Sequence, residues 1–146
     1  MIFASHDGYL DIVELLLSKG ANINHKNNDG CSSLFFASQN GHCNVVEYLL
    51  SNGAKINDKT NDNFTPLMIA SETNQYSVVL LLLPLGASIH DKNNDGNTCL
   101  QITKNNEIKI LLSNWYVTMV TIILLEMQVL SIFDPSSFLD LHEYIG

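Results

Sequence analysis

A pattern that returns at a fixed interval constrains this chain more than any other feature of its sequence. Similar segments run over residues 4–24, 37–57 and 70–90, and each starts 33 residues after the one before it. A fourth copy begins at residue 94 and then falls out of step. A period of this length is typical of a solenoid, in which each short unit buries its apolar face only by stacking on its neighbours.

Each copy contains the signals of two helices and a turn. Val45, Val46 and Leu49 have the spacing of a helical apolar stripe, and Gly53 is placed to end that helix. Gly41 is placed to end a shorter helix before it. The Asn-, Asp- and Gly-rich stretches between copies predict projecting hairpins. We therefore expect an all-α solenoid of helix-turn-helix units with β-hairpin-like loops and an irregular C-terminal helical segment.

Three motifs resemble those of the ankyrin-repeat family. The segment Thr65-Pro66-Leu67-Met68-Ile69-Ala70 resembles the family signature T-P-L-H-x-A, with Met68 in place of His. Gly41-His42 followed by Val45-Val46 is similar to its G-H-x-x-V-V pattern, and Gly-Ala pairs stand at 20–21, 53–54 and 86–87. The resemblance covers residues 1–114. It implies a partial unit at 1–27, units at 28–60 and 61–93, a degenerate unit at 94–114, and an irregular hydrophobic and acidic tail at 115–146.

The copies also depart from one another. Asn63 and Asn74 stand where Gly is expected, and Pro84 is expected to shorten the second helix of its unit. In the fourth copy, Leu111-Leu112 repeats Leu49-Leu50 at an offset of 62 residues, so we expect about a turn of helix to be missing. Neither end of the array carries the polar cap that keeps solenoids soluble.

The segment 115–133 is mostly apolar, and three interpretations remain open. Tyr116, Val120, Ile123, Met127 and Leu130 could form the stripe of a helix that caps the solenoid. The length also suits a membrane span, although Glu126 near its middle costs about 3 kcal/mol. The third interpretation is a sequence that no longer encodes a repeat. Residues 138–144 predict a short amphipathic helix or a loosely held end.

The composition limits the classes of function that this chain can have. Seven Lys, no Arg and fifteen acidic residues give a formal charge of −8, which excludes the basic face that nucleic acid requires. The three cysteines do not have the spacing of a disulfide framework or a zinc site. We expect the cytoplasm or another reducing intracellular compartment. The many asparagines are given no functional weight.

No enzymatic constellation is present in the sequence, so we expect no catalysis, no cofactor and no metal. His42 occupies the Gly-His position of the family, and the resemblance implies a structural hydrogen bond between turns. A nucleophile requires a facing base and a third group to orient it, and adjacency of Cys43 to His42 does not supply these. The sequence contains neither a Gly-rich phosphate loop nor a His-Glu-x-x-His motif.

The resemblance implies a protein–protein interaction scaffold that binds through its hairpin tips and concave inner-helix face; its partner and oligomeric state are left open. The alternative is the ankyrin module of a membrane-tethered protein, with residues 115–133 as the span. Family contact positions correspond here to Lys26, Asn28, Asp29, Cys31, Gln39, Asn40, Lys59, Asn61, Asp62, Phe64, Glu72, Thr73, Lys92, Asn94, Asp95 and Asn97. Phe64 is either an exposed anchor or a side chain folded onto the neighbouring hairpin.

Overall fold

A computed structural model describes residues 1–129, and residues 130–146 lie outside the described part of the chain. The helices are α1 (Ile2–His6), α2 (Leu10–Ser18), α3 (Ser33–Gln39), α4 (Cys43–Ser51), α5 (Pro66–Glu72), α6 (Tyr76–Leu82), α7 (Cys99–Ile102) and α8 (Asn106–Val129). One isolated antiparallel β-bridge joins Lys26 to Ser32 within the first loop between units.

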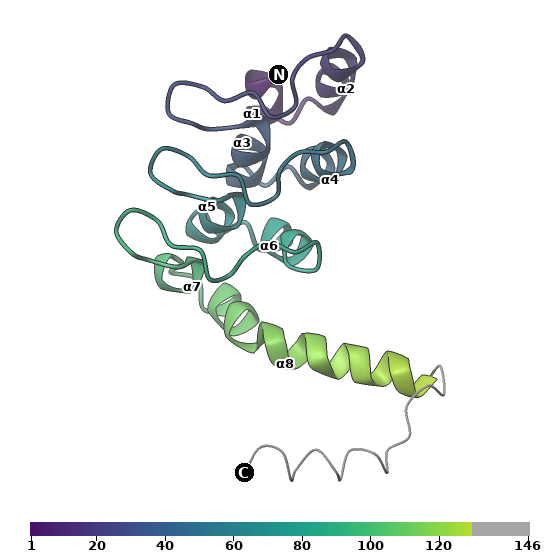
Figure 1. Cartoon of the computed structure of the whole chain (residues 1–146), viewed down its shortest axis with the longest axis vertical. Helices are drawn as coiled ribbons and strands as arrows, with labels where there is room; N and C mark the ends of the chain where they lie inside the picture. The colour runs from purple at the N-terminus through teal and green to yellow at the C-terminus, as the bar shows by residue number, and fades with distance from the viewer. Residues whose placement is uncertain (130–146) are drawn as a thin grey trace. The chain divides into compact units, whose positions relative to one another are not determined.

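Within residues 1–112 the helices stack in two rows. In Figure 1, α1, α3, α5 and α7 form an inner row, α2, α4 and α6 form an outer row, and three loops project beside the inner row. Neighbouring helices of each row are in contact, and each inner helix up to α5 also contacts the outer helix that follows it. The predicted all-α stack of helix-turn-helix units is confirmed.

The inner helices α3 and α5 begin at side-chain caps. Ser32 accepts a hydrogen bond from the amide of Phe35, and Thr65 accepts one from the amide of Met68. Pro66 follows Thr65 at the first helical position, where its missing N–H costs nothing. At the other end of α5, Asn74 adopts a φ of +65°, the left-handed conformation that Gly41 takes in the preceding unit.

The core runs between the two rows. Leu49 and Leu82 of the outer helices are completely buried, and so is Leu67 of the inner helices. Leu34, also of an inner helix, is 1% exposed. This places Leu49 in the core as predicted. Ala37 is also fully buried, since a small side chain lets the helices approach closely.

Pro84 has the predicted effect on the third unit. Helix α4 has nine residues, whereas the equivalent helix α6 has seven and ends at Leu82. Proline lacks the amide hydrogen that would extend the helix.

The fourth unit corrects the predicted register. Helix α7 begins 66 residues after α3, but α8 begins only 63 residues after α4. Ile108 and Leu112 are buried, which places them at the positions of Val45 and Leu49. The offset is therefore 63 residues and not 62, and Leu112, rather than Leu111, replaces Leu49.

Helix α8 continues without interruption through residue 114, the predicted end of the repeats. By its contacts the chain divides into Met1–Leu112 and Ser113–Gly146. In the described part of the second unit, Val117, Val120, Ile122 and Leu125 are all exposed. These residues lie around the helix, and the capping interpretation of residues 115–133 stays a prediction. Leu130 and the expected helix at 138–144 lie outside the described residues.

Among residues 1–129, no single helix is both long enough and apolar enough to cross a membrane. Two helical segments joined at a bend, Asn106–Trp115 and Val117–Glu126, meet those criteria together by length and composition alone.

Candidate functional site

The three projecting loops share one local design. The amide of Asn27 donates to the carbonyl of Cys31 at 3.0 Å, and the same bond joins Thr60 to Phe64 and Asn93 to Asn97. The side chain of the first residue then accepts backbone N–H groups of the loop: Asn27 from Asp29 and Cys31, Thr60 from Phe64, and Asn93 from Asp95 and Asn97. A side chain that satisfies the loop backbone in this way fixes the loop conformation.

Consecutive loops are also bonded to one another. The amide of Asn61 donates to the carbonyl of Asp29 at 3.0 Å, and that of Asn94 donates to Asp62 at 3.1 Å. The side-chain amides follow the same rule, because Asn61 donates to the carbonyl of Asn28 and Asn94 donates to that of Asn61. The predicted contact residues Asn61 and Asn94 therefore use amide hydrogens to hold the loops in a row.

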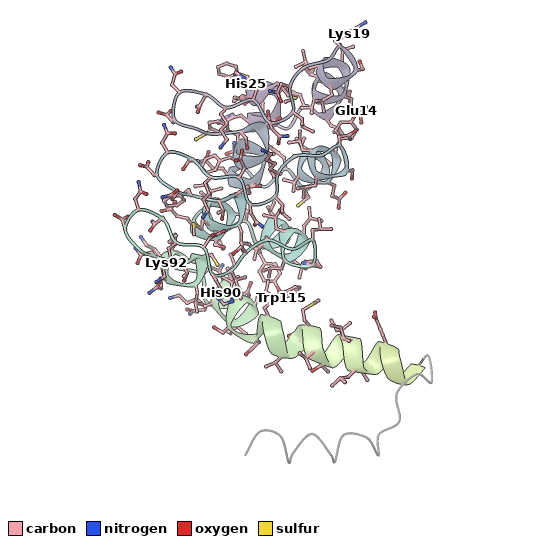
Figure 2. All side chains as sticks on the ribbon, viewed as in Figure 1. Glu14, Lys19, His25, His90, Lys92 and Trp115 are labelled. Atoms are coloured by element: carbon pink, nitrogen blue, oxygen red, sulfur yellow. The ribbon has the colours of Figure 1, made fainter. Side chains whose placement is uncertain are left out.

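Two of the predicted lysines are neutralised within the fold. The Nζ atom of Lys26 lies 2.7 Å from a carboxylate oxygen of Asp58, and that of Lys59 lies 2.8 Å from Asp91. Lys26 also donates to the carbonyl of Lys59. Lys92, on the loop that joins α6 to α7 (Figure 2), is exposed, and no ion pair of Lys92 is recorded among residues 1–129.

The loop tips are acidic. Asp29, Asp62 and Asp95 recur one unit apart and are exposed. Their field reaches Cys31, whose thiol pKa is raised first by burial and then by Asp29 and Asp62. With Lys26 and Lys59 paired to carboxylates, the three aspartates outnumber the exposed Lys92, so this edge keeps a net negative charge.

Phe64 is half-buried, as are Cys31 and Asn97 at the equivalent positions of the other loops. Its backbone is fixed by hydrogen bonds to both the amide and the side chain of Thr60. Part of the aromatic residue is therefore accessible while its backbone is held.

The remaining predicted contact residues lie at the C-terminal ends of α3 and α5, where Glu72 is exposed and Gln39 is half-buried. Asn40 donates to the carbonyl of His6 at 3.0 Å, and Thr73 donates to that of Gln39 at 2.9 Å. These two side chains link adjacent units. The sixteen predicted residues thus form two groups, one at the loop tips and one at the far ends of the inner helices.

The turn between the helices of a unit uses His42 as the resemblance implied. Its Nε2 atom lies 2.9 Å from the carbonyl oxygen of His6 in the preceding unit. Gln75, one unit later, makes the equivalent bond to the carbonyl of Gln39 at 3.1 Å. Gln75 was not among the predicted residues, because an amide gives no motif in place of the expected His.

The cysteines show no activation. Cys31, Cys43 and Cys99 are free thiols. Burial and the Glu47 carboxylate raise the pKa of Cys43, whereas a nucleophilic cysteine needs a lowered one. Burial raises the pKa of Cys99 to about 11. The described residues contain no group of three or more His, Cys, Asp or Glu side chains that could hold a metal ion.

Comparison with known proteins agrees with this architecture. No curated protein matches the sequence. The family model for ankyrin repeats matches residues 1–93 in three copies, which is more than half of the chain. Only these repeats were found, they are typically non-catalytic, and no catalytic domain was identified. With its three stacked helix pairs and bonded loops, the chain belongs to the ankyrin-repeat family.

Proposed function

We propose that this chain is a protein-interaction scaffold that binds its partner through the loop tips and the inner-helix face. Ankyrin repeats are generally protein-binding modules. The exposed residues of such a module select the partner, because the buried ones are required for packing.

The observation that carries this proposal is the hydrogen-bonded row of loops. The bonds from Asn61 to Asp29 and from Asn94 to Asp62 hold three exposed loop tips in fixed register before any partner arrives. A surface ordered in advance loses less conformational entropy on binding. Loops without such bonds would have to be ordered at the expense of affinity.

The charges at the tips favour a partner with basic side chains. Asp29, Asp62 and Asp95 are exposed, while Lys26 and Lys59 are paired with carboxylates of the next unit. Complementary charge chiefly raises the association rate and the selectivity. Salt should therefore weaken binding by slowing association.

Partner capture with the full chain, followed by titration of the captured protein, tests the proposal. Phe64→Ala should weaken binding by about 1–2 kcal/mol with the fold intact, since a partly accessible aromatic residue is a typical anchor. Asp62→Asn should slow association, and Asp11→Asn on the outer helix α2 is its matched control. Equal affinity for wild type and Phe64→Ala would show that Phe64 is not part of the binding surface. Equal association rates for Asp62→Asn and Asp11→Asn would show that the loop tips are not part of it.

A second candidate is a membrane-tethered module, with residues 115–133 as the span; residues 130–133 lie outside the described part. The exposed apolar residues around α8, including Val120 and Ile123, favour it. Flotation with neutral phosphatidylcholine vesicles tests it. The full chain should float, and a Val120→Lys, Ile123→Lys double variant should remain at the bottom of the gradient. Failure of the wild-type chain to float would reject this candidate.

We also propose that the protein works in the cytoplasm or another reducing intracellular compartment. Three free thiols support this location.

A further inference from the structure

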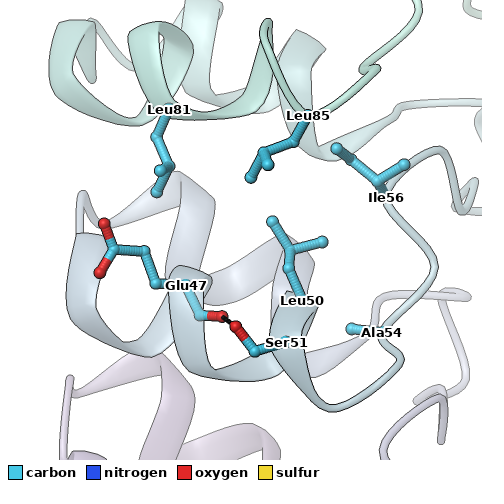
Figure 3. A pocket seen from close by; sticks show the side chains of 7 residues that line it. All are labelled: Glu47, Leu50, Ser51, Ala54, Ile56, Leu81 and Leu85. Atoms are coloured by element: carbon cyan, nitrogen blue, oxygen red, sulfur yellow. Dashed lines mark hydrogen bonds between the residues drawn. The ribbon is translucent and has the colours of Figure 1, made fainter.

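A hollow opens on the outer surface, between α4 and α6 (Figure 3), and it has a volume of about 520 Å³. Its floor and one wall come from α4 and the chain that follows: Glu47, Leu50, Ser51, Ala54 and Ile56. Leu81 of α6 and Leu85 of the turn after it form the opposite wall. We call this hollow the outer groove. It is lined by none of the sixteen loop-tip and inner-helix residues described above.

The repeat supplies an internal comparison for the outer groove. One unit earlier, the residues equivalent to its floor and first wall are identical: Glu14, Leu17, Ser18, Ala21 and Ile23. The opposite wall differs at both positions, because Tyr48 stands where the groove has Leu81 and Asn52 where it has Leu85. The two equivalent sites therefore have the same floor residues and differ at two wall positions.

Each substitution changes the wall in a definite way. Leu81 is shorter than Tyr48, so its side chain leaves room over this floor for a ring supplied by another molecule. Asn52 is polar, and its side chain donates to the carbonyl of Tyr48 at 2.8 Å. Leu85 is instead 54% exposed. Covering an apolar wall that is open to water with another apolar group lowers the free energy.

Among the described residues, Glu47 is the only charged one that lines the outer groove. It is exposed, and no ion pair of its carboxylate is recorded among residues 1–129. A cation placed at this rim would complement it, and the charge of −8 on the whole chain adds to the attraction.

We propose that the outer groove binds a peptide segment of another protein that carries an aromatic side chain with a Lys or Arg beside it. The ring lies over Leu50 between Leu81 and Leu85, and the cation pairs with Glu47. This gives the scaffold a second docking surface on its outer face, separate from the loop tips.

A methyl NMR titration of the full chain tests the chemistry, with tyramine as the probe because it joins a phenol ring to an ammonium group. The Leu50, Leu81 and Leu85 methyl signals should shift and saturate. Those of Leu17, on the identical floor one unit earlier, should not move. Glu47→Gln should weaken tyramine binding by about 2- to 5-fold, the value of an exposed ion pair, and leave the neutral probe 4-ethylphenol unaffected.

Matched variants test the geometry. Leu81→Tyr should abolish the saturable shifts by filling the outer groove, and the milder change Leu85→Asn should reduce them, so that the proposal does not depend on one variant folding. The reverse pair Tyr48→Leu and Asn52→Leu should create a second tyramine site whose binding shifts Leu17.

A random peptide display library panned against the full chain then tests the peptide. Selected sequences should be enriched in Phe, Tyr or Trp with Lys or Arg beside it, and this enrichment should disappear against Leu81→Tyr. Phe64→Ala should leave both the enrichment and the tyramine titration unchanged, which separates this proposal from the loop-tip function.

Several results would overturn the proposal. These are the absence of saturable shifts at the three groove leucines, equal shifts at Leu17, or the same peptides selected by Leu81→Tyr. Self-association of the free chain that Leu81→Tyr abolishes in sedimentation would assign the outer groove to a second copy instead. Vesicle binding that Leu81→Tyr abolishes would assign it to lipid.

Discussion

The second and fourth units follow one plan but differ in length, and the difference shows what a repeat can lose. Helix α3 has seven residues and α7 has four, although both begin at equivalent positions. The missing residues therefore belong to the inner helix. The outer helix still buries Ile108 and Leu112 where the second unit buries Val45 and Leu49. The deletion thus shortens one helix while the core register of the next is kept.

The largest expected difference between these units is the effect of truncating their equivalent leucines. Leu49→Ala should lower the free energy of unfolding by about 2–5 kcal/mol, since Leu49 is fully buried between two neighbouring units. Leu112→Ala should lower the free energy of unfolding by about 2 kcal/mol, the lower limit of that range. Urea unfolding measures both. A larger loss at Leu112 would contradict the view that the fourth unit is the weaker one.

The second prediction concerns Cys99, which begins α7 where Ser33 begins α3. Burial raises the pKa of Cys99 from 9.0 to about 11. Between these pH values the unfolded chain loses the proton and the folded chain keeps it, so stability present below pH 9 is lost as the pH rises through 11. The loss should approach about 2–3 kcal/mol.

The pH dependence of unfolding, measured for wild type and Cys99→Ala, checks this prediction. Only the difference between the two curves is informative, because lysines and tyrosines titrate in the same range. Parallel curves from pH 8 to 11 would show that ionisation of Cys99 is not coupled to folding.

The caps of the inner helices provide a smaller contrast. Thr65 is fully buried and accepts the amide of Met68, whereas Thr98, the cap of α7, is half-buried and its amide is bonded by Gln101. Thr65→Ala should cost about 1–2 kcal/mol and Thr98→Ala about 0.5–1 kcal/mol. Thermal melting of both variants measures the difference, and the reverse order would show that burial does not decide the strength of these caps.

The smallest expected effect concerns the turns between paired helices. His42→Ala removes the bond to the carbonyl of His6 and should cost about 0.5–1.5 kcal/mol. His42→Gln should restore most of this, because Gln75 makes the equivalent bond in the next unit. Urea unfolding checks both changes. A His42→Gln variant as unstable as His42→Ala would show that the imidazole ring itself is required.

The sequence predicts the exposed acidic residues of the surface but not the ion pairs of its lysines. The exposed tips Asp29, Asp62 and Asp95 are found by the period alone, because hairpins carry exposed polar residues. The period does not reveal that Lys26 is paired with Asp58 of the next unit. Such pairings join residues about one unit apart, and the sequence does not show which side chains meet.

Several asparagines have a structural role that their abundance in the sequence did not predict. Asn24 accepts the amide of Lys55 at 3.0 Å, and Asn57 accepts that of Ser88 at 2.9 Å. These residues, together with Asn61 and Asn94, hold adjacent units together. The abundance of asparagine alone did not predict this role, because it does not separate an asparagine that bonds another unit from one in water.

Local spacing and backbone chemistry are enough to predict the period, the two helices of each unit, the shortening at Pro84 and the burial of Leu49. The folded chain was needed to establish the register of the fourth unit and the neutralisation of Lys26 and Lys59. It also showed that Glu47, Leu81 and Leu85 line one hollow between α4 and α6. The physical reason is that these features depend on contacts between units, where one side chain determines the space and charge left for another.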